Sequence, residues 1–472
     1  MNVAFGPLRV LPLVALLAAL PAGNAASSDG AHAPASASSV AASARTAASA
    51  ATATSVERGR YLVRAGDCES CHTAPGGKEL AGGYPIPTPF GVIYSTNLTP
   101  DRDTGIGAWS KDDFWNALHR GKDDEGEHLY PAMPYPWFTK MSRADVDAIK
   151  DYLATVPAAD VRNKEPELPW PLSWRTVMAG WNLLFFHEGE MQPDPAKSAE
   201  WNRGAYLVEG PGHCGACHTP KNALGAVKRD EAFRGGSVGE HWFAPSLTSD
   251  VRDGIGDWSV AEIVEYLKTG SNDKTASAGE MTNVVRNSTQ YLSDSDLKAI
   301  AVYLKDIPAT REEANAAAAS AETIRRGEAV YVDNCTGCHM DNGAGLAKVF
   351  PPLAKSASIQ ASDPGSLLHV VLGGAVMAAP KTKPTGLAMP GFRDKLNDQQ
   401  IAEVVSYIRN AWGNHGSPVD AATVAKVRKA EIESPQGDPG AKRAEMLVCR
   451  SRGAPATCPA PAAERAPAPG HS

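Results

Sequence analysis

Three short segments of the chain place two cysteines and a histidine in the same spacing, a pattern suited to redox or ligand chemistry. The segments are CESCH (Cys68, Cys71, His72), CGACH (Cys214, Cys217, His218) and CTGCH (Cys335, Cys338, His339). Three kinds of site use such residues: a redox-active dithiol, a zinc ion, and a c-type haem bound through thioethers. The surrounding sequence distinguishes between these sites.

Neither the dithiol nor the zinc ion accounts for all of the residues in the pattern. A CxxC dithiol makes no use of the adjacent histidine, and it is typical of a thioredoxin-like βαβ unit, whereas strand-like runs are missing from the flanks here. Zinc needs four ligands, but each segment offers three at most. A second CxxC at zinc-finger spacing is also missing from each segment's surroundings.

Covalent haem uses both cysteines and the histidine. The two thiols form thioethers with the porphyrin vinyl groups, and the histidine becomes the proximal iron ligand. We therefore predict three haem c groups, with His72, His218 and His339 as proximal ligands. A unit of about 100 residues has a small core, and a haem would supply much of its apolar surface.

The sixth iron ligand decides between an electron carrier and a catalyst, because a methionine thioether closes the iron and raises its reduction potential. Each repeat has a methionine shortly before its last helix: Met133 in YPAMPYP, Met281 in SAGEMTN and Met389 in AMPGF. We predict these three as distal ligands. The alternative is that they fill the core, with the distal position left to one of the competitors Met141, Met377 and His128.

Two further segments are expected near the haem edges. They are STNLTP, with Thr96 and Asn97, and FPPLA, with Pro351 and Pro352. From their position we expect backbone groups of these residues to bind the haem propionates or to support the proximal histidine.

The elements that hold these residues recur with them, and the pattern predicts an all-α fold. Each repeat opens with a helix carrying Arg-Gly, at Gly59, Gly204 and Gly327, and closes with a helix of matching apolar register. The glycines would let the two helices approach closely. The expected N-caps of the closing helices are Ser142, Ser293 and Asn397, followed three residues later by Asp145, Asp296 and Gln400.

The first two repeats share one more helix start, in GIGAWS and GIGDWS. Ser110 and Ser259 are its expected N-caps. We interpret Trp109 and Trp258, which precede the caps, as packing residues in preference to a direct role in electron transfer.

Composition excludes several classes of protein. The 472 residues predict about two to four domains. A hydrophobic fraction of 43%, a charged fraction of 21% and a net charge of −7 are typical of a globular protein and argue against nucleic acid as a partner. Nucleotide-binding loops, catalytic triads and open metal sites are not recognisable, so we expect no substrate chemistry in this chain alone.

The ends of the chain differ in composition from its middle. LPLVALLAAL, preceded by Arg9, indicates an export signal too short to span a bilayer, and later segments are also too short, so we expect a soluble or peripheral protein. Export would allow a disulfide between Cys449 and Cys458. The predicted segments are a signal peptide (1–25), an Ala/Ser-rich disordered tether (26–54), haem domains (55–160, 201–310 and 320–415), an aromatic-rich bridge (161–200), and a low-complexity Pro/Ala-rich tail (416–472).

The bridge contains LPWPLSWRTVMAGWNLLFF, the most aromatic stretch of the chain. One interpretation is a helix buried between two haem units. The other is a surface that binds a partner subunit or the bilayer interface, with tryptophan as an interfacial anchor.

Over residues 56 to 415, the three CxxCH units, NRGAYLVEGPGHCGACHTPKNALGA and MAGWNLLFF together resemble a known family. This is the three-haem cytochrome c subunit of bacterial membrane-bound dehydrogenases for alcohols, gluconate, sorbitol and aldehydes. The resemblance implies three tandem class I cytochrome c domains. It also implies a partner subunit with a quinone, flavin or molybdenum cofactor, and delivery of electrons to ubiquinone or a terminal oxidase at the periplasmic face of the inner membrane.

Two other functions stay open. A self-sufficient haem enzyme would need one iron with a labile or absent sixth ligand, and the second repeat is the candidate for it. A cytochrome module serving an oxidase directly is the other.

Overall fold

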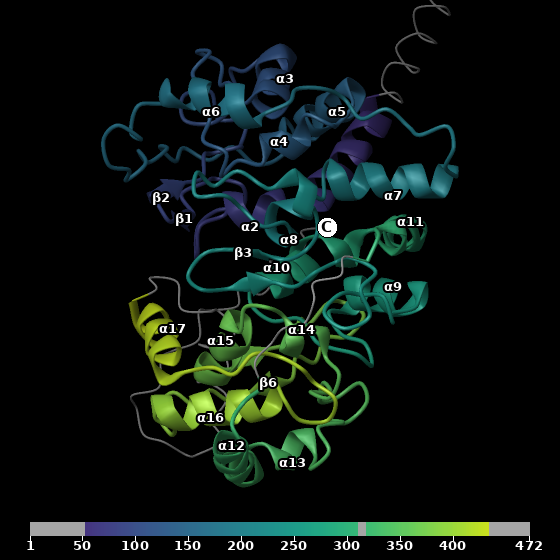
Figure 1. Ribbon diagram of the computed structural model, residues 1–472. Helices are drawn as coiled ribbons and strands as arrows, with labels where there is room; N and C mark the ends of the chain where they lie inside the picture. Colours follow the sequence, from purple (N-terminus) through teal and green to yellow (C-terminus); the bar gives the residue numbers. More distant parts are fainter. Residues whose placement is uncertain (1–51, 310–317, 434–472) are drawn as a thin grey trace, which may run out of the picture. The chain divides into compact units, whose positions relative to one another are not determined.

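The computed structural model describes residues 52–309 and 318–433. The predicted signal peptide, residues 26–51 of the predicted tether, and the tail cysteines Cys449 and Cys458 lie outside the described residues. The described chain follows the three repeats in order, and Figure 1 shows each repeat as a group of short helices with long connections.

The first repeat is described from residue 52, so residues 52–54, which were predicted as tether, are helical. Its elements are a helix over residues 52–65, α2 (Cys68–His72), β1 (Pro85–Thr88), β2 (Gly91–Tyr94), α3 (Lys111–Arg120), α4 (Tyr135–Phe138) and α5 (Arg143–Leu153). The segment that follows contains α6 (Val177–Phe185).

The second and third repeats have the same order of opening helix, CxxCH turn and closing helix. The second contains α7 (Ala199–Glu209), α8 (Gly215–His218), η1 (Arg229–Glu231), β3 (Gly236–Ser237), β4 (Phe243–Ala244), α9 (Val260–Thr269), α10 (Glu280–Asn287), η2 (Thr289–Tyr291) and α11 (Asp294–Asp306). The third contains α12 (Ala321–Asn334), α13 (Thr336–His339), α14 (Ala357–Gln360), α15 (Gly365–Gly373), β5 (Ala375–Val376), β6 (Ala388–Met389), α16 (Asp398–Ile408) and α17 (Ala421–Glu433).

The opening and closing helices of each repeat meet at the Arg-Gly glycine, as predicted. The pairs α7–α11 and α12–α16 lie side by side in Figure 1. A Cβ atom built on each of these glycines would almost coincide with a carbonyl oxygen of the closing helix. The distances are 1.9 Å for Gly59 and Ala148, 1.9 Å for Gly204 and Ala299, and 2.1 Å for Gly327 and Glu403. Because such distances are far inside van der Waals contact, each crossing requires a residue without a side chain.

The N-caps of the closing helices are confirmed. The side chains of Ser142, Ser293 and Asn397 accept hydrogen bonds from the backbone N–H three residues on, at 3.3, 3.1 and 2.9 Å. Ser110 and Ser259 cap α3 and α9 in the same way, each within a complete capping box.

Each repeat has its own hydrophobic core, built on the predicted register of the closing helix. Val146, Leu297 and Ile401 occupy matching positions in these helices and are fully buried, one in each core. Trp109 and Trp258 pack against the first and second cores, as expected of packing residues.

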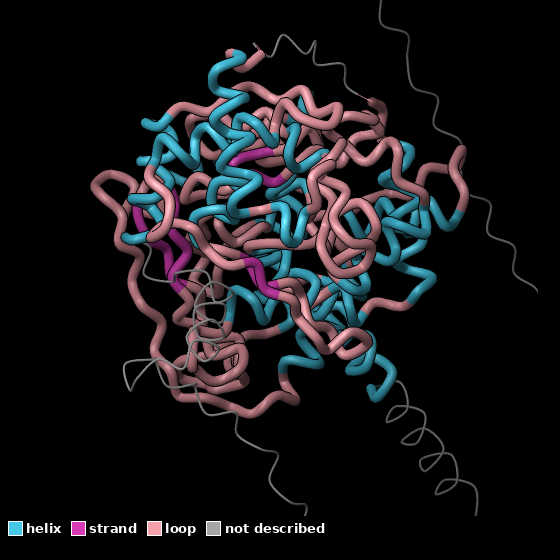
Figure 2. The backbone as a smooth tube through the Cα atoms, turned by 90° about the horizontal axis from the view of Figure 1, so that it is seen from below, coloured by secondary structure: helices cyan, strands magenta, loops and turns pink. Residues whose placement is uncertain are grey.

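The sequence predicted helices alone, whereas the described residues also contain three short antiparallel two-stranded sheets, β1–β2, β3–β4 and β5–β6. Figure 2 shows them as brief magenta segments among loops that carry much of the chain. The strands are two to four residues long, so they pin loops together and leave the cores to the helices.

The predicted tail from residue 416 starts too early, because the chain forms α17 before the described residues end. Val424 and Val427 of this helix are buried in the core of the third repeat. Arg428 donates through Nε to Asp398 at 2.7 Å and through a terminal nitrogen to the Leu396 carbonyl at 2.9 Å. Residues 416–433 therefore complete the third repeat.

The segment over residues 161–200 lies mainly on the first repeat. Glu167 and Val92 exchange backbone hydrogen bonds of 2.8 and 3.1 Å, which adds the segment to the edge of the β1–β2 sheet. The Tyr130 hydroxyl donates to the Leu172 carbonyl at 2.9 Å. Met178 is the buried residue of α6.

Many large apolar side chains of this segment are exposed. Trp170 is 72% exposed, Trp174 60%, Leu183 86% and Leu184 66%. The interpretation as a helix buried between two haem units is therefore wrong for this face of the segment.

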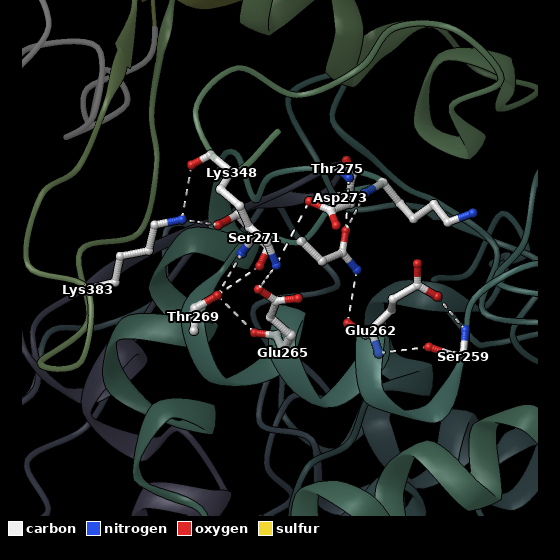
Figure 3. A network of polar contacts seen from close by, with 11 residues as sticks. Ser259, Glu262, Glu265, Thr269, Ser271, Asp273, Thr275, Lys348 and Lys383 are labelled. Carbon is white, nitrogen blue, oxygen red and sulfur yellow. Dashed lines mark hydrogen bonds and ion pairs between the residues drawn. The ribbon is translucent and has the colours of Figure 1, made fainter. Parts of the chain in front are cut away.

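The second and third repeats meet through both aromatic and polar side chains, and Figure 3 draws part of the polar network. The ring of Trp242 stacks on the buried ring of His369 with centroids 4.4 Å apart.

The polar network includes two lysines of the third repeat. Lys348 pairs with Glu265 on α9 and lies 3.9 Å from a carboxylate oxygen of Asp273. The ammonium group of Lys383 donates to the Ser271 hydroxyl at 2.8 Å. Exposed ion pairs of this kind contribute little each.

Within residues 52–309 and 318–433, no helix has both the length and the apolar character needed to cross a lipid bilayer.

The glycine crossings generate a stability prediction. Gly204→Ala would push a methyl group into the Ala299 carbonyl, and we expect it to lower the free energy of unfolding by about 1–3 kcal/mol or more. Gly180→Ala is the matched control, because a Cβ there meets nothing within 4 Å, and a helical Gly→Ala change gains up to about 1 kcal/mol. Denaturant unfolding of both variants checks the prediction, and equal stability of the two would contradict it.

Candidate functional site: three cysteine–histidine centres

The histidine of each CxxCH motif is held by a backbone carbonyl through its Nδ1 atom. Nδ1 lies 2.7 Å from the Thr96 oxygen in His72, 2.7 Å from the Pro245 oxygen in His218, and 3.1 Å from the Pro351 oxygen in His339. Because a carbonyl only accepts, Nδ1 carries the proton in each ring, and the lone pair lies on Nε2. Each imidazole is thereby oriented as a ligand that binds through Nε2.

The loop that supplies this carbonyl is fixed in the same way in all three repeats. The leucine two residues after the carbonyl donates its backbone N–H to a carbonyl of the preceding loop. These bonds run from Leu98 to Leu80, from Leu247 to Phe233 and from Leu353 to Gly343, each at 2.8–2.9 Å. The histidine carbonyls accept from Gly82, Gly235 and Gly345 at 2.8, 2.9 and 3.1 Å. The same backbone frame thus surrounds each motif.

Buried polar side chains hold these loops in place. Asn97 is 1% exposed and donates to the Ala159 carbonyl at 2.7 Å, while its amide oxygen accepts from the Thr99 N–H and hydroxyl. In the third repeat, Asn414 donates to the Leu353 carbonyl at 2.9 Å. Losing such buried partners costs about 1–3 kcal/mol each, so the proximal loops are rigid.

The prediction that Thr96 and Pro351 lie where they support the proximal histidine is confirmed by these hydrogen bonds. The equivalent residue of the second repeat, Pro245, was missed. Aligning APSLTSD with STNLTPD on the shared Leu-Thr would have found it, since this places Pro245 opposite Thr96.

Burial sets the protonation states of the motifs. Desolvation lowers the pKa of His72, His218 and His339 below the ordinary value for imidazole, although the bonds to the backbone carbonyls oppose it. The histidines are therefore neutral at pH 7, which is the form that binds a metal ion.

The thiol pKa of the first cysteine in each motif is raised, whereas a redox-active thiol has a lowered pKa. Burial raises the pKa of Cys68 and Cys214 to about 12 and that of Cys335 to about 11. Reactive dithiols need a lowered thiol pKa. The raised pKa values therefore argue against the dithiol interpretation. The six motif cysteines are all free thiols.

A large cavity adjoins the first motif. Its volume is about 1050 Å³, and Cys68, Cys71 and His72 form part of its wall. Met133 lines the same cavity, together with apolar residues of the core such as Leu118. A space of this size and apolar character suits a planar organic group, whereas a single zinc ion would need converging ligands at about 2 Å.

The structure places the three predicted distal methionines differently. Met133 lies in the turn between α3 and α4, on the wall of the cavity that holds His72. Met281 is the second residue of α10 and not in a loop as expected, and Met389 lies in β6, opposite Ala375.

Of the competitors for the distal positions, His128 has another partner, Met141 belongs to the first core, and Met377 is tied by its backbone. His128 accepts at Nδ1 from the side-chain amide of Asn182 at 3.2 Å. Met141 is 1% exposed and belongs to the first core, although it also borders the cavity. Met377 donates its backbone N–H to Leu387 at 2.9 Å.

The donor sets fit haem c in chemistry and number. Each motif offers two thiols and one neutral imidazole whose Nε2 is the remaining nitrogen. Two thioethers and one proximal ligand require these groups.

Comparison with known proteins agrees with this chemistry. A family model for cytochrome c matches residues 56–157 and 324–412. These ranges correspond to the first and third repeats. The second repeat resembles these two in the backbone hydrogen bonds that surround its motif.

Whole-chain relatives extend the match. The gluconate 2-dehydrogenase cytochrome c subunit of Pantoea cypripedii is 42% identical over 413 residues, covering 83% of this chain and 93% of the relative. The cytochrome c subunit of the quinone alcohol dehydrogenase of Gluconobacter oxydans (strain 621H) is 41% identical over 393 residues, covering 79% and 82%. The fructose dehydrogenase cytochrome subunit of Gluconobacter japonicus is 34% identical over 414 residues, covering 81% and 84%. The chain therefore belongs to the family of cytochrome c subunits of dehydrogenases, and it carries covalently bound haem c.

Proposed function

We propose that this chain is a three-haem electron-transfer subunit of a dehydrogenase complex. Each haem is attached through the cysteine pair of one motif: Cys68 and Cys71, Cys214 and Cys217, or Cys335 and Cys338. The proximal ligands are His72, His218 and His339, and the distal ligands are Met133, Met281 and Met389.

The observation that carries the proposal is the threefold recurrence of one hydrogen bond. In every repeat, a histidine next to two unbonded cysteines, buried in the first and third repeats and half-buried in the second, donates Nδ1–H to the carbonyl of a rigid loop. A histidine that only fills the core would not require the same hydrogen bond in all three repeats. A proximal ligand does, since the hydrogen bond fixes both the tautomer and the plane of the ring.

Bound haem c supplies an iron that changes oxidation state by one electron. The chain would hold this group at the wall of a cavity lined largely by apolar side chains. His72 would bind the iron through a neutral nitrogen, Met133 on the same cavity wall would offer a thioether as a second ligand, and the rigid Asn97 loop keeps the imidazole from reorienting. Such a site favours electron transfer over substrate binding.

The partner is proposed to be a dehydrogenase catalytic subunit, because the relatives are named as cytochrome subunits of gluconate, alcohol and fructose dehydrogenases. The acceptor is proposed to be ubiquinone or a terminal oxidase, with the complex at the periplasmic face of the inner membrane. The catalytic subunit carries the substrate chemistry in this arrangement.

The number of haems and their coordination test the proposal. We expect intact-mass analysis of the exported protein to show three covalent haems and the reduced spectrum to be low-spin throughout. We also expect the reduced protein to bind no carbon monoxide, because a closed sixth position excludes it. Rapid carbon monoxide binding at one haem would favour the self-sufficient haem enzyme, and fewer than three haems would contradict the proposal.

A pair of methionine variants provides the internal control. Met133→Leu keeps the side-chain volume but removes the sulfur, so one haem of three should become high-spin and bind carbon monoxide. Met141→Leu, also on the cavity wall, should leave all three low-spin. If the two variants behaved alike, Met133 would not be the distal ligand.

The exposed face of residues 170–184 is proposed as the surface that binds the catalytic subunit. Trp181 and Phe185 on α6 line the first haem cavity, while Leu183 and Leu184 on the same helix are exposed. A protein bound here would lie directly over that cavity. Exposed apolar patches of this kind mark interaction sites, and α6 contains no lysine or arginine, which an interfacial membrane helix would carry.

Leu183→Ser tests this surface, with the dehydrogenase catalytic subunit that purifies with the full-length chain as the probe. We expect binding to weaken about ten-fold or more, because burying a leucine side chain is worth about 1.5–3 kcal/mol. Haem content should stay unchanged. Val251→Ser, which removes an apolar side chain that is 71% exposed in the second repeat, is the control and should bind normally. Unchanged affinity for the catalytic subunit would contradict this assignment. So would a variant that binds the catalytic subunit normally but no longer floats with liposomes.

A further inference from the structure

A tryptophan of the first repeat packs against the haem-attachment motif of the second. Trp137 lies in α4, four residues after Met133, and lines the cavity that also contains His72. A Cβ built on Gly215 would lie 3.1 Å from the Trp137 Nε1 atom. Gly215 directly follows Cys214 in the CGACH motif, so the indole touches the turn that carries the second haem's cysteines.

The reverse contact also exists. The side-chain amide of Asn287, at the end of α10 in the second repeat, donates to the Ser70 hydroxyl at 2.8 Å, and Ser70 lies inside the CESCH motif of the first repeat. Next to Trp137, the ring of Phe138 packs edge-on against His213 with centroids 5.4 Å apart. Each attachment motif is therefore in contact with the other repeat.

Both motifs border one continuous cavity. Its lining includes Cys71 of the first motif and Cys217 of the second, with Trp137 on the wall between the repeats. The lining residues come from the first repeat, the segment after it and the second repeat. The cysteine pairs of the first two motifs therefore line the same cavity. The Trp137 side chain stands beside the second motif in this cavity.

The third repeat has a different surrounding. Gly337 of its CTGCH motif would meet nothing within 4 Å if it carried a Cβ. The contacts of this repeat with the second lie elsewhere, as in the stack of Trp242 on His369 and the ion pair of Lys348 with Glu265. Close packing of an attachment motif against a neighbouring repeat is therefore a feature of the first two motifs.

We propose that Trp137 is a positioning residue for electron exchange between the first and second haems. The inference rests on the proposed three-haem function. The step moves one electron between the two irons, so that one is oxidised and the other reduced, with no bond or proton changed. The indole stands on the wall between the two attachment sites and packs against Gly215 of the second motif.

Exchange NMR of the half-reduced full-length protein tests the proposal, because haem methyl signals report each haem separately. For Trp137→Leu we expect electron exchange between the first and second haems to slow on the order of ten-fold, as geometry-dependent steps do when partners shift. Gly215→Ala should act in the same direction by displacing the indole. Exchange between the second and third haems, and all three reduction potentials, should stay unchanged.

Gly337→Ala is the matched control, a Gly→Ala change inside a CxxCH motif with open space around it. It should leave every exchange rate as in the parent protein. If Trp137→Leu failed to fold, Gly215→Ala would decide. If the variants carry three haems and their electron exchange is unchanged, the role of Trp137 is overturned and the proposed function stands. The same holds if Gly337→Ala slows the exchange equally. If the haems are absent, the proposed function is overturned as well.

Discussion

The hydrogen bond from the Nδ1 of each motif histidine to a backbone carbonyl is the constraint on which the three centres depend. It exists because the loop carrying Thr96, Pro245 or Pro351 is pinned by backbone bonds and buried side chains, which leave the carbonyl no freedom to turn away. It leaves Nε2 as the ligand nitrogen, while burial keeps the ring neutral. The loop, the ring and the adjacent thiols therefore form one site in which the ligand nitrogen has a fixed orientation.

The helix crossings provide the frame for that constraint. Glycine at 59, 204 and 327 brings the opening helix, which leads into each motif, against the closing helix that carries the core register. Lys150 and Lys305 of two closing helices each donate to a carbonyl of the GIG turns, at 2.6 and 2.7 Å. The two ends of each repeat thus hold the loops between them.

Much of this arrangement was predictable because it follows local and repeated rules. The capping serines, the glycine crossings and the buried positions of the closing helices depend on residue types at fixed spacings, and the threefold repetition confirms each pattern against the others. The loop around Thr96 was placed from its position alone, and the equivalent loop around Pro245 was missed. Repetition of a pattern within one chain substitutes for comparison between chains.

The failures have physical causes as well. Helix α17 was missed because its sequence is rich in Ala, Lys and Glu, and its two fully buried apolar residues, Val424 and Val427, are too few to show an apolar pattern. Met281 was expected in a loop, since no nearby residue signals that α10 would begin at Glu280. The short strands depend on pairing between distant loops, which residue types alone do not reveal.

The two kinds of contact between repeats suggest a division of labour within the chain. Between the first and second repeats, the attachment motifs themselves are in contact through Trp137, Gly215 and the Ser70–Asn287 hydrogen bond. Between the second and third, Trp242 stacks on the buried ring of His369, and Lys348 pairs with Glu265. Both of these contacts lie outside the third attachment motif. The first two motifs are therefore packed against the neighbouring repeat, whereas the third repeat is joined to the second through residues away from its motif.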